Sequence, residues 1–382
     1  MSFHLKSARE FERFIMLSFF CGRYSPFFNS ISTWSISFFF LMSVSDKAKI
    51  LLSLTLKKEK LPEIEAKLNS APNFTAVHPL QPNTRLNYLQ ILQYVSASNA
   101  VKQCGGKYIV FITDVEASQN HAFNSDKEGI DRASEYAIEM LKHFGVEAEF
   151  IKSSDYSLNN HELFFEMVKN SITISVQDVA NILPPKSGKE IQTASNLISP
   201  CLEATEMTFL KADFIITSEI DEAKYIFVNK FDPERKAVVI PMVNILNLKN
   251  NMARIDVNNN FFVEDEKEAT AKKAKAAFCT DEIENNPIYN ALICIFVANN
   301  EITISDKVYK NVDDIKNDFA KMEKKVVKDT ICQIVTDGTL KVREEFKNEK
   351  LAVLTNNIID ALNPKKKVPA KKQNKKQQQQ QK

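Results

Sequence analysis

Residues 108–113 read YIVFIT, and this unbroken apolar run is typical of a strand buried on both faces of a parallel sheet. A helical pattern over 84–103 precedes it and ends at Gly105. A second helical pattern, stopped by Gly145, follows it, and residues 147–152 read as the next strand. Strands that alternate with helices predict a parallel sheet with helices on both faces.

The same alternation extends in both directions along the chain. The further predicted elements are a strand at 74–77, a helix at 190–210, a strand at 213–217, a helix at 221–230 and a strand at 236–240. The predicted fold class is therefore α/β, with a Rossmann-type parallel doubly wound sheet. In such sheets ligands bind at the carboxyl ends of the strands, where the strand order reverses.

A different pattern begins near residue 251, where helical periodicity dominates. We expect helices at 264–279, 287–297, 312–335 and 339–362, with a small pair of strands near 301–310. The predicted domains are a Phe-rich extension (1–41), a Rossmann catalytic-like domain (42–250), a helical domain (251–363) and a disordered Lys/Gln tail (364–382).

Composition excludes several classes of protein. Of the 382 residues 44% are apolar and 26% charged, which is typical of chains that fold around ordinary cores. The seven glycines form neither G-x-G-x-x-G nor a P-loop, so a glycine-cradled phosphate site is not expected. The six cysteines lie far apart, without C-x-x-C pairs, which indicates no zinc cluster and favours a reducing compartment. None of the five histidines shows metal-ligand spacing.

The first 41 residues hold ten of the 27 phenylalanines and the only tryptophan, Trp34. Residues 27–44 carry no charge, which is the lower end of a length that spans a bilayer. Pro26, Asn29 and several serines reduce the apolarity of this stretch. It is either a membrane anchor or, as we expect, an irregular extension upstream of a functional start at Met42.

Several segments, in order, resemble one family. FIKSSDYSL (150–158), AKKAKAAFCTDEIENNP (271–287), DFAK (318–321) and VREEF (342–346) are similar to segments of the archaeal and eukaryotic tyrosyl-tRNA synthetases. The resemblance covers residues 46–362. It implies a class I catalytic domain of Rossmann type, followed by a helical anticodon-binding domain.

The resemblance also implies an ATP site, whose first signature is an H-[LIV]-G-H-like motif after the first strand. Aligned through YLQI at 88–91, that motif corresponds to four residues that lack both histidines and the glycine: Thr84, Arg85, Leu86 and Asn87. We expect the branched side chain of Leu86 to clash with adenine.

The second signature of the family, K-M-S-S-S, neutralises the leaving pyrophosphate. Its counterpart here contains Asn251, Met252 and Arg254, of which only the methionine is shared. Arg254 or Lys249 could act in place of the missing lysine, or either could be a solvated charge. The family's Gly-Gly pair after a later strand is replaced by Thr217 and Ser218, which keep backbone farther from a ligand.

The tyrosine pocket that the resemblance implies is also changed. The positions that hold the substrate's hydroxyl and amino groups are here Phe74, Ser199, Glu203 and Glu206. Asp114 is retained, either as a ligand residue or as a cap at the end of its strand, and Glu116 replaces a histidine. Polar substrate groups left unpaired would cost about 1–3 kcal/mol each.

Contacts to tRNA are predicted at two places. In the helical domain, Lys328 is the one retained residue of the family's anticodon-reading segment, whose other positions correspond to Glu323, Lys324 and Val326. The last eighteen residues carry eight lysines and no acid, so the chain before them has a charge of −6 against +2 overall. The tail is either an RNA-attracting segment, through Lys365, Lys366, Lys367, Lys371 and Lys372, or a solubilising or nuclear-address segment.

The sequence thus predicts a synthetase-like protein that is inactive or impaired in catalysis and acts through dimerisation and tRNA or RNA binding. The partner is a second copy or a synthetase relative, the location is cytoplasmic, and ATP with Mg²⁺ is implied only if activity remains. Two alternatives stand beside this prediction. One is an active tyrosine–tRNA ligase, and the other is a membrane-tethered interaction protein.

Overall fold

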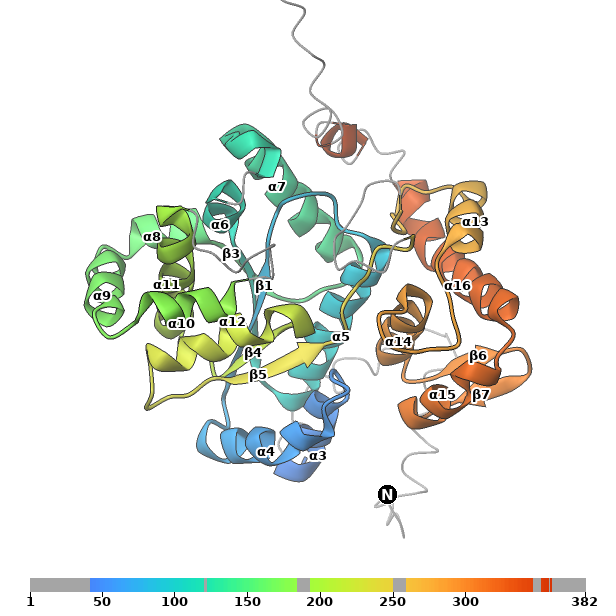
Figure 1. The fold of residues 1–382 in the computed structure, drawn as a ribbon, viewed down its shortest axis with the longest axis horizontal. Helices are drawn as coiled ribbons and strands as arrows, with labels where there is room; N and C mark the ends of the chain where they lie inside the picture. The colour runs from blue at the N-terminus through green and yellow to red at the C-terminus, as the bar shows by residue number, and fades with distance from the viewer. Residues whose placement is uncertain are drawn as a thin grey trace, which may run out of the picture. The chain divides into compact units, whose positions relative to one another are not determined.

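A computed structural model describes residues 42–119, 122–183, 193–249, 259–345, 352–356 and 358. The described residues from Val44 onward belong to one compact unit (Figure 1). The Phe-rich extension and the lysine tail lie outside the described residues, and so does the counterpart of the second signature.

The centre of this unit is a parallel sheet in which the strand order is β3-β2-β1-β4-β5. The strands are β1 Thr75–Leu80, β2 Lys107–Ile112, β3 Glu149–Lys152, β4 Phe214–Ser218 and β5 Val238–Met242. The order reverses between β1 and β4, so the predicted doubly wound sheet is confirmed.

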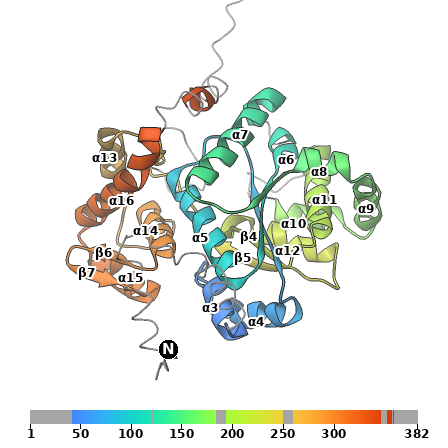
Figure 2. The same cartoon turned by 180° about the vertical axis from the view of Figure 1, so that it is seen from behind.

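Helices cover both faces of this sheet (Figures 1 and 2). They are α3 Val44–Leu52, α4 Leu61–Ser70, α5 Tyr88–Cys104, α6 Asp114–Gln119, α7 Lys127–His143, α8 Ser153–Asn159, α9 Glu162–Ser171, α10 Val176–Ile182, α11 Ala194–Phe209 and α12 Glu222–Ile226. One core packs α3, α4, α5 and α7 against the sheet, and a second core packs α9, α10, α11 and α12 against the opposite face.

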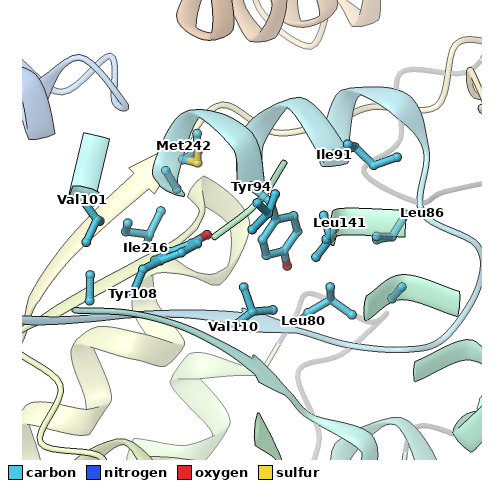
Figure 3. Packing of buried hydrophobic residues seen from close by; sticks show 14 of the residues in the cluster. Leu80, Leu86, Ile91, Tyr94, Val101, Tyr108, Val110, Leu141, Ile216 and Met242 are labelled. Carbon is cyan, nitrogen blue, oxygen red and sulfur yellow. The ribbon is translucent and has the colours of Figure 1, made fainter. Parts of the chain in front are cut away.

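Successive side chains of a strand point to opposite faces of the sheet and so contribute alternately to the two cores. In β2, Val110 and Ile112 belong to the first core, whereas Ile109 and Phe111 belong to the second. Every one of these residues is at most 2% exposed, which explains why the strand reads as an unbroken apolar run. Tyr94 of α5 lies over the same first face (Figure 3).

Strand β1 is longer than the predicted strand at 74–77. It pairs with β2 as far as Leu80, but with β4 only at Ala76 and Val77. Pro79, which has no N–H to donate, lies beyond the stretch that pairs with β4. The proline therefore shortens the pairing on one side without ending the strand.

Beyond the sheet the chain forms a helical part. Its elements are α13 Lys267–Ala276, α14 Pro287–Asn299, β6 Ile302–Ile304, β7 Lys307–Tyr309, α15 Val312–Asp318 and α16 Lys324–Glu345. Helix α14 packs on α5, whose residues Tyr88, Leu89 and Leu92 join the core of the helical part. The apolar residues of α5 thus pack partly against the sheet and partly against the helical part.

The predicted boundary between the helices at 312–335 and 339–362 is wrong. The break lies at Met322, between α15 and α16, and α16 continues through Gly338. A Cβ at Gly338 would stand 1.9 Å from the hydroxyl oxygen of Tyr88. The glycine marks a close contact between helices instead of a helix end.

Candidate functional site

Polar side chains gather where β2, β3 and β4 end, and α11 lies across them. Asp114 begins α6 directly after β2, and Ser153 begins α8 directly after β3. Glu203 comes from α11 and Lys224 from α12, the short helix that follows β4. The sequence order therefore brings these groups to the ligand-binding edge of a doubly wound sheet.

Lys224 is at the centre of the cluster. Its Nζ lies 2.6 Å from Oε1 of Glu116 and 2.5 Å from Oε2 of Glu203. The Tyr225 hydroxyl donates a further hydrogen bond to Glu203. The side chain of Glu203 is 5% exposed and that of Lys224 is 17% exposed. This is a largely desolvated ion cluster and not a surface ion pair.

The charges of the cluster shift one another's pKa. Burial alone would lower the pKa of Lys224, but the carboxylates of Glu116 and Glu203 outweigh it and raise that pKa above its ordinary range. Burial raises the pKa of Glu203, and the nearby Glu116 carboxylate acts in the same direction. Lys224 therefore remains an ammonium ion at neutral pH.

The remaining acids are satisfied by serines of α8. Glu206 accepts hydrogen bonds from Ser153 Oγ at 2.5 Å and from Ser157 Oγ at 3.1 Å. Burial raises the pKa of Glu206 to about 8. Asp114 accepts from Ser154 N at 3.0 Å and from Ser154 Oγ at 2.5 Å. Asp114 thus holds the start of α8, which agrees with a structural role at the strand end.

Little space remains between these groups. The cavity amounts to about 10 Å³, enough for one water at most. It is lined by the three glutamates together with Thr113, Val115, Gln119, Ser153, Ser199 and Leu202. A tyrosine side chain does not fit into this volume.

Of the predicted tyrosine-pocket residues, the structure brings together Ser199, Glu203 and Glu206. Phe74 is elsewhere, because it precedes β1 at the amino edge of the sheet. It is fully buried, and its ring meets that of Phe214 edge-on at 5.0 Å. Phe74 is therefore a core residue remote from the cluster.

The residues at the first signature serve packing and capping. Leu86 is 4% exposed and lies in the first core with Leu80, Ile91 and Leu141 (Figure 3). Asn87 caps α5, where its side chain accepts from Gln90 N. A purine would have to displace a buried leucine here, so these residues do not fit the adenine of ATP.

Arg85 is also engaged within the fold. Its Nη1 lies 3.6 Å from Glu264 Oε2, and its guanidinium carbon lies 4.4 Å from the centroid of the Phe262 ring. The Tyr136 hydroxyl donates to the same Glu264 at 2.8 Å. The Arg85 charge is thus held by an acid and a ring, and is not directed toward a phosphate.

Of the other predicted ATP-site residues, three are described in the structure and three lie outside the described residues. Thr217 is buried at the end of β4, and Ser218 Oγ donates to Asp221 Oδ2 at 2.7 Å. Thr84 is partly buried beside Arg85. Asn251, Met252 and Arg254 lie outside the described residues.

The predicted tRNA contact Lys328 caps a helix. Its Nζ donates to the carbonyl of Ala277 at 2.6 Å and to that of Lys275 at 3.3 Å, at the carboxyl end of α13. Lys365, Lys366, Lys367, Lys371 and Lys372 lie outside the described residues.

Sequence reasoning missed Lys224 and Tyr225. Glu203 and Glu206 stand three residues apart in a helix otherwise rich in buried residues, so both acids face inward. Buried acids require a cation or donors, and this requirement was the available signal. The signal predicts a partner but does not identify which of 50 basic residues supplies it.

Three observations limit other kinds of site. Within the described ranges, no three His, Cys, Asp or Glu side chains are grouped so that they could hold a metal ion. The cysteines of those ranges are all free. No described helix has both the length and the apolarity to cross a membrane.

Comparisons with known proteins place the chain near one group. No protein-family model matches it. It is 23% identical over 343 residues to the cytoplasmic tyrosine–tRNA ligase 1 of Arabidopsis thaliana. This alignment covers 81% of this chain and 86% of that protein. It is 22% identical over 296 residues to tyrosine–tRNA ligase 2 of the same plant, covering 71% of this chain but only 40% of the ligase.

The fold has the same neighbours. The tyrosyl-tRNA synthetase of Aeropyrum pernix matches with a TM-score of 0.74 and 14% identity, over 83% of this chain and 99% of that one. These matches confirm the predicted resemblance, at the low identity of a divergent relative, and the predicted class I Rossmann-type fold.

Proposed function

We propose that this divergent relative of the tyrosyl-tRNA synthetases keeps their scaffold, does not form tyrosyl-adenylate, and acts by binding a partner chain and RNA. The proposal treats residues 42–250 as a catalytic-like domain that no longer binds the family's substrates, and residues 251–363 as a domain related to anticodon-binding domains.

The observation that carries the proposal is the position of Lys224. Its ammonium lies between Glu116 and Glu203, at the strand ends where the family resemblance implies the amino-acid pocket. A tyrosine would have to displace this ammonium from both carboxylates before its own amino group could reach them. Removing one member of a buried ion pair costs about 3–5 kcal/mol, and the binding of a tyrosine would first have to offset that cost.

The nucleotide side supports the same conclusion. Activation of an amino acid requires groups that stabilise charge on the α-phosphate and on the leaving pyrophosphate. At the first signature both histidines are absent, Leu86 is packed into the core, and Arg85 is paired with Glu264. Both substrates of the first half-reaction therefore meet residues that serve packing instead of binding.

Tyrosine-dependent exchange of pyrophosphate into ATP tests the proposal directly. The Arabidopsis thaliana ligase 1, assayed in parallel, serves as the positive control. We expect no exchange above the level without tyrosine. Turnover in the ordinary range of about 1–10³ s⁻¹ would contradict the proposal.

An active tyrosine–tRNA ligase is the second candidate. It is favoured by the alignment, which spans 86% of the plant ligase 1. The same exchange assay decides between the two, because only the active ligase couples tyrosine to pyrophosphate exchange.

The proposed partner surface is on α8, α9, α10 and α11. Seven large apolar side chains are exposed on these helices or directly after α9: Leu158, Phe164, Phe165, Val168, Ile172, Val176 and Ile198. We call these residues the apolar face. Such a patch is typical of a protein interaction site, and the proposed occupant is a second copy of the chain or a synthetase relative.

The proposed RNA contact is the lysine tail, since the ammonium of Lys328 is engaged at the end of α13. Eight lysines without an acid attract phosphates in a salt-dependent manner. The proposed location is the cytoplasm, in line with the names of the two plant ligases.

A further inference from the structure

The surroundings of Lys224 have the composition of an ammonium-binding site. Two carboxylates, from Glu116 and Glu203, lie within 2.6 Å of Nζ. The centroid of the Tyr225 ring lies 5.3 Å from the same atom. Paired carboxylates and an aromatic face are the groups that proteins use to hold an alkylammonium ion.

Two acids share the one positive charge that Lys224 supplies. The single ammonium of Lys224 lies against Glu116 and Glu203, and Glu206 lines the same cavity of about 10 Å³ as these two acids. Glu206 relies on hydroxyl donors, Ser153 and Ser157, instead of a cation. A simple structural ion pair would need one carboxylate, so the site has more acceptors than a pair requires.

Lys224 also differs from the neighbouring lysine that follows α12. The Lys230 side chain is 49% exposed and pairs with Asp178 at the surface. The side chain of Lys224 instead turns inward from a helix of five residues and is 17% exposed.

We propose that the space between Glu116, Glu203 and Tyr225 is a binding site for a primary ammonium group, which the chain occupies with its own Lys224. This inference rests on the proposed function, because the filled site is the reason that an amino-acid substrate is excluded. A primary ammonium fits since it offers three N–H donors to the two carboxylates, whereas a quaternary ammonium has none.

Lys224→Ala tests the inference, because it removes the atoms from Cγ to Nζ and propylammonium carries the same atoms. The measurement is thermal unfolding of the full chain in propylammonium chloride, compared with sodium chloride at equal ionic strength. We expect the melting temperature of Lys224→Ala to rise saturably, by roughly 2 °C or more at ten times Kd.

Three controls accompany this measurement. Wild type and Lys230→Ala should not respond to propylammonium, because their sites are filled. Tetramethylammonium should not stabilise Lys224→Ala, because it cannot donate. The inference is overturned if propylammonium leaves Lys224→Ala unchanged, if it stabilises all three proteins equally, or if tetramethylammonium acts as well.

A measurement on the wild type keeps the inference testable if Lys224→Ala does not fold. Reductive methylation of the native chain, followed by mass spectrometry, should modify Lys224 at least tenfold more slowly than Lys230. Equal rates would contradict an occupied, closed site.

The two proposals can fail separately. If the wild type shows no pyrophosphate exchange and Lys224→Ala ignores propylammonium, only the ammonium site is refuted. If the wild type exchanges pyrophosphate at a synthetase rate, the proposed function is refuted whatever the amine does.

Discussion

Gly338 of α16 faces the phenol of Tyr88 of α5, and a Cβ at position 338 would stand 1.9 Å from the Tyr88 hydroxyl oxygen and 2.7 Å from the ring carbon that bears it. Tyr88 also joins the core of the helical part, although α5 covers the central sheet. The glycine therefore lets α16 approach the helix that connects the two cores.

Gly338→Ala is expected to lower the free energy of unfolding by about 1–3 kcal/mol, because it overpacks this contact. Helix propensity alone predicts the opposite, a gain of about 1 kcal/mol. Urea unfolding of both proteins distinguishes the two predictions. In a Tyr88→Phe background the cost should shrink, since the closest atom is gone, and a stabilised single variant would show that the contact is not close.

Lys224→Met is expected to destabilise the chain by about 3–5 kcal/mol, because it leaves the buried carboxylates of Glu116 and Glu203 unpaired. Chemical denaturation of the full chain provides the measurement. Lys230→Met is the matched control, and it should cost at most about 1 kcal/mol, because the Lys230–Asp178 pair is at the surface. Similar destabilisation of both variants would contradict the buried cluster.

The stability of the chain should decrease as pH rises from about 5 to 8. Burial raises the pKa of Glu206 to about 8 from an ordinary 4.5, so the folded state keeps a proton that the unfolded state releases in this window. The contribution is fully present below pH 4.5, declines by up to about 1.4 kcal/mol per pH unit, and is lost above pH 8. Glu203 acts in the same direction.

Urea midpoints at a series of pH values measure this dependence. Glu206→Gln is neutral at every pH and should flatten the profile. Glu63→Gln, at a side chain that is 60% exposed, should leave the profile unchanged. A Glu206→Gln profile as steep as that of the wild type would show that Glu206 ionises normally.

Phe165→Asp tests the apolar face. Phe165 is 76% exposed on α9, and a carboxylate there would have to be desolvated in a packed interface. We expect the wild type to elute with the mass of two chains in light-scattering chromatography and the variant with the mass of one. Val308→Asp on β7, at a residue that is 48% exposed, should not change the mass. A monomeric wild type would rule out a homodimer, and mixing with a synthetase relative would then test the heterodimer.

Replacement of Lys365, Lys366, Lys367, Lys371 and Lys372 by Gln tests the tail. For single-stranded RNA, the dependence of affinity on salt should become shallower by about 0.7 for each phosphate that the tail no longer neutralises. Lys328→Gln should keep the wild-type salt dependence, because the ammonium of Lys328 caps α13. If Lys328→Gln weakens RNA binding and the tail variant does not, RNA binds to the helical part instead.

The sequence by itself determined the alternation of strands and helices. Each strand and helix has a local pattern, such as the apolar run of β2 or the stop of α5 at Gly105, where φ is 76°. The reversal of strand order and the gathering of polar residues at the strand ends follow from that alternation. The changes at Leu86, Glu203 and Glu206 were also evident from residue identity.

Only the tertiary structure decided which residues meet. Lys224 reaches Glu116 across more than a hundred residues, Gly338 meets Tyr88 across still more, and Phe74 lies at the amino edge of the sheet, away from the cluster. A local pattern carries no information about such partners, because a buried charge or a missing side chain states what a position needs but not which distant segment provides it. Packing of the whole chain selects that segment.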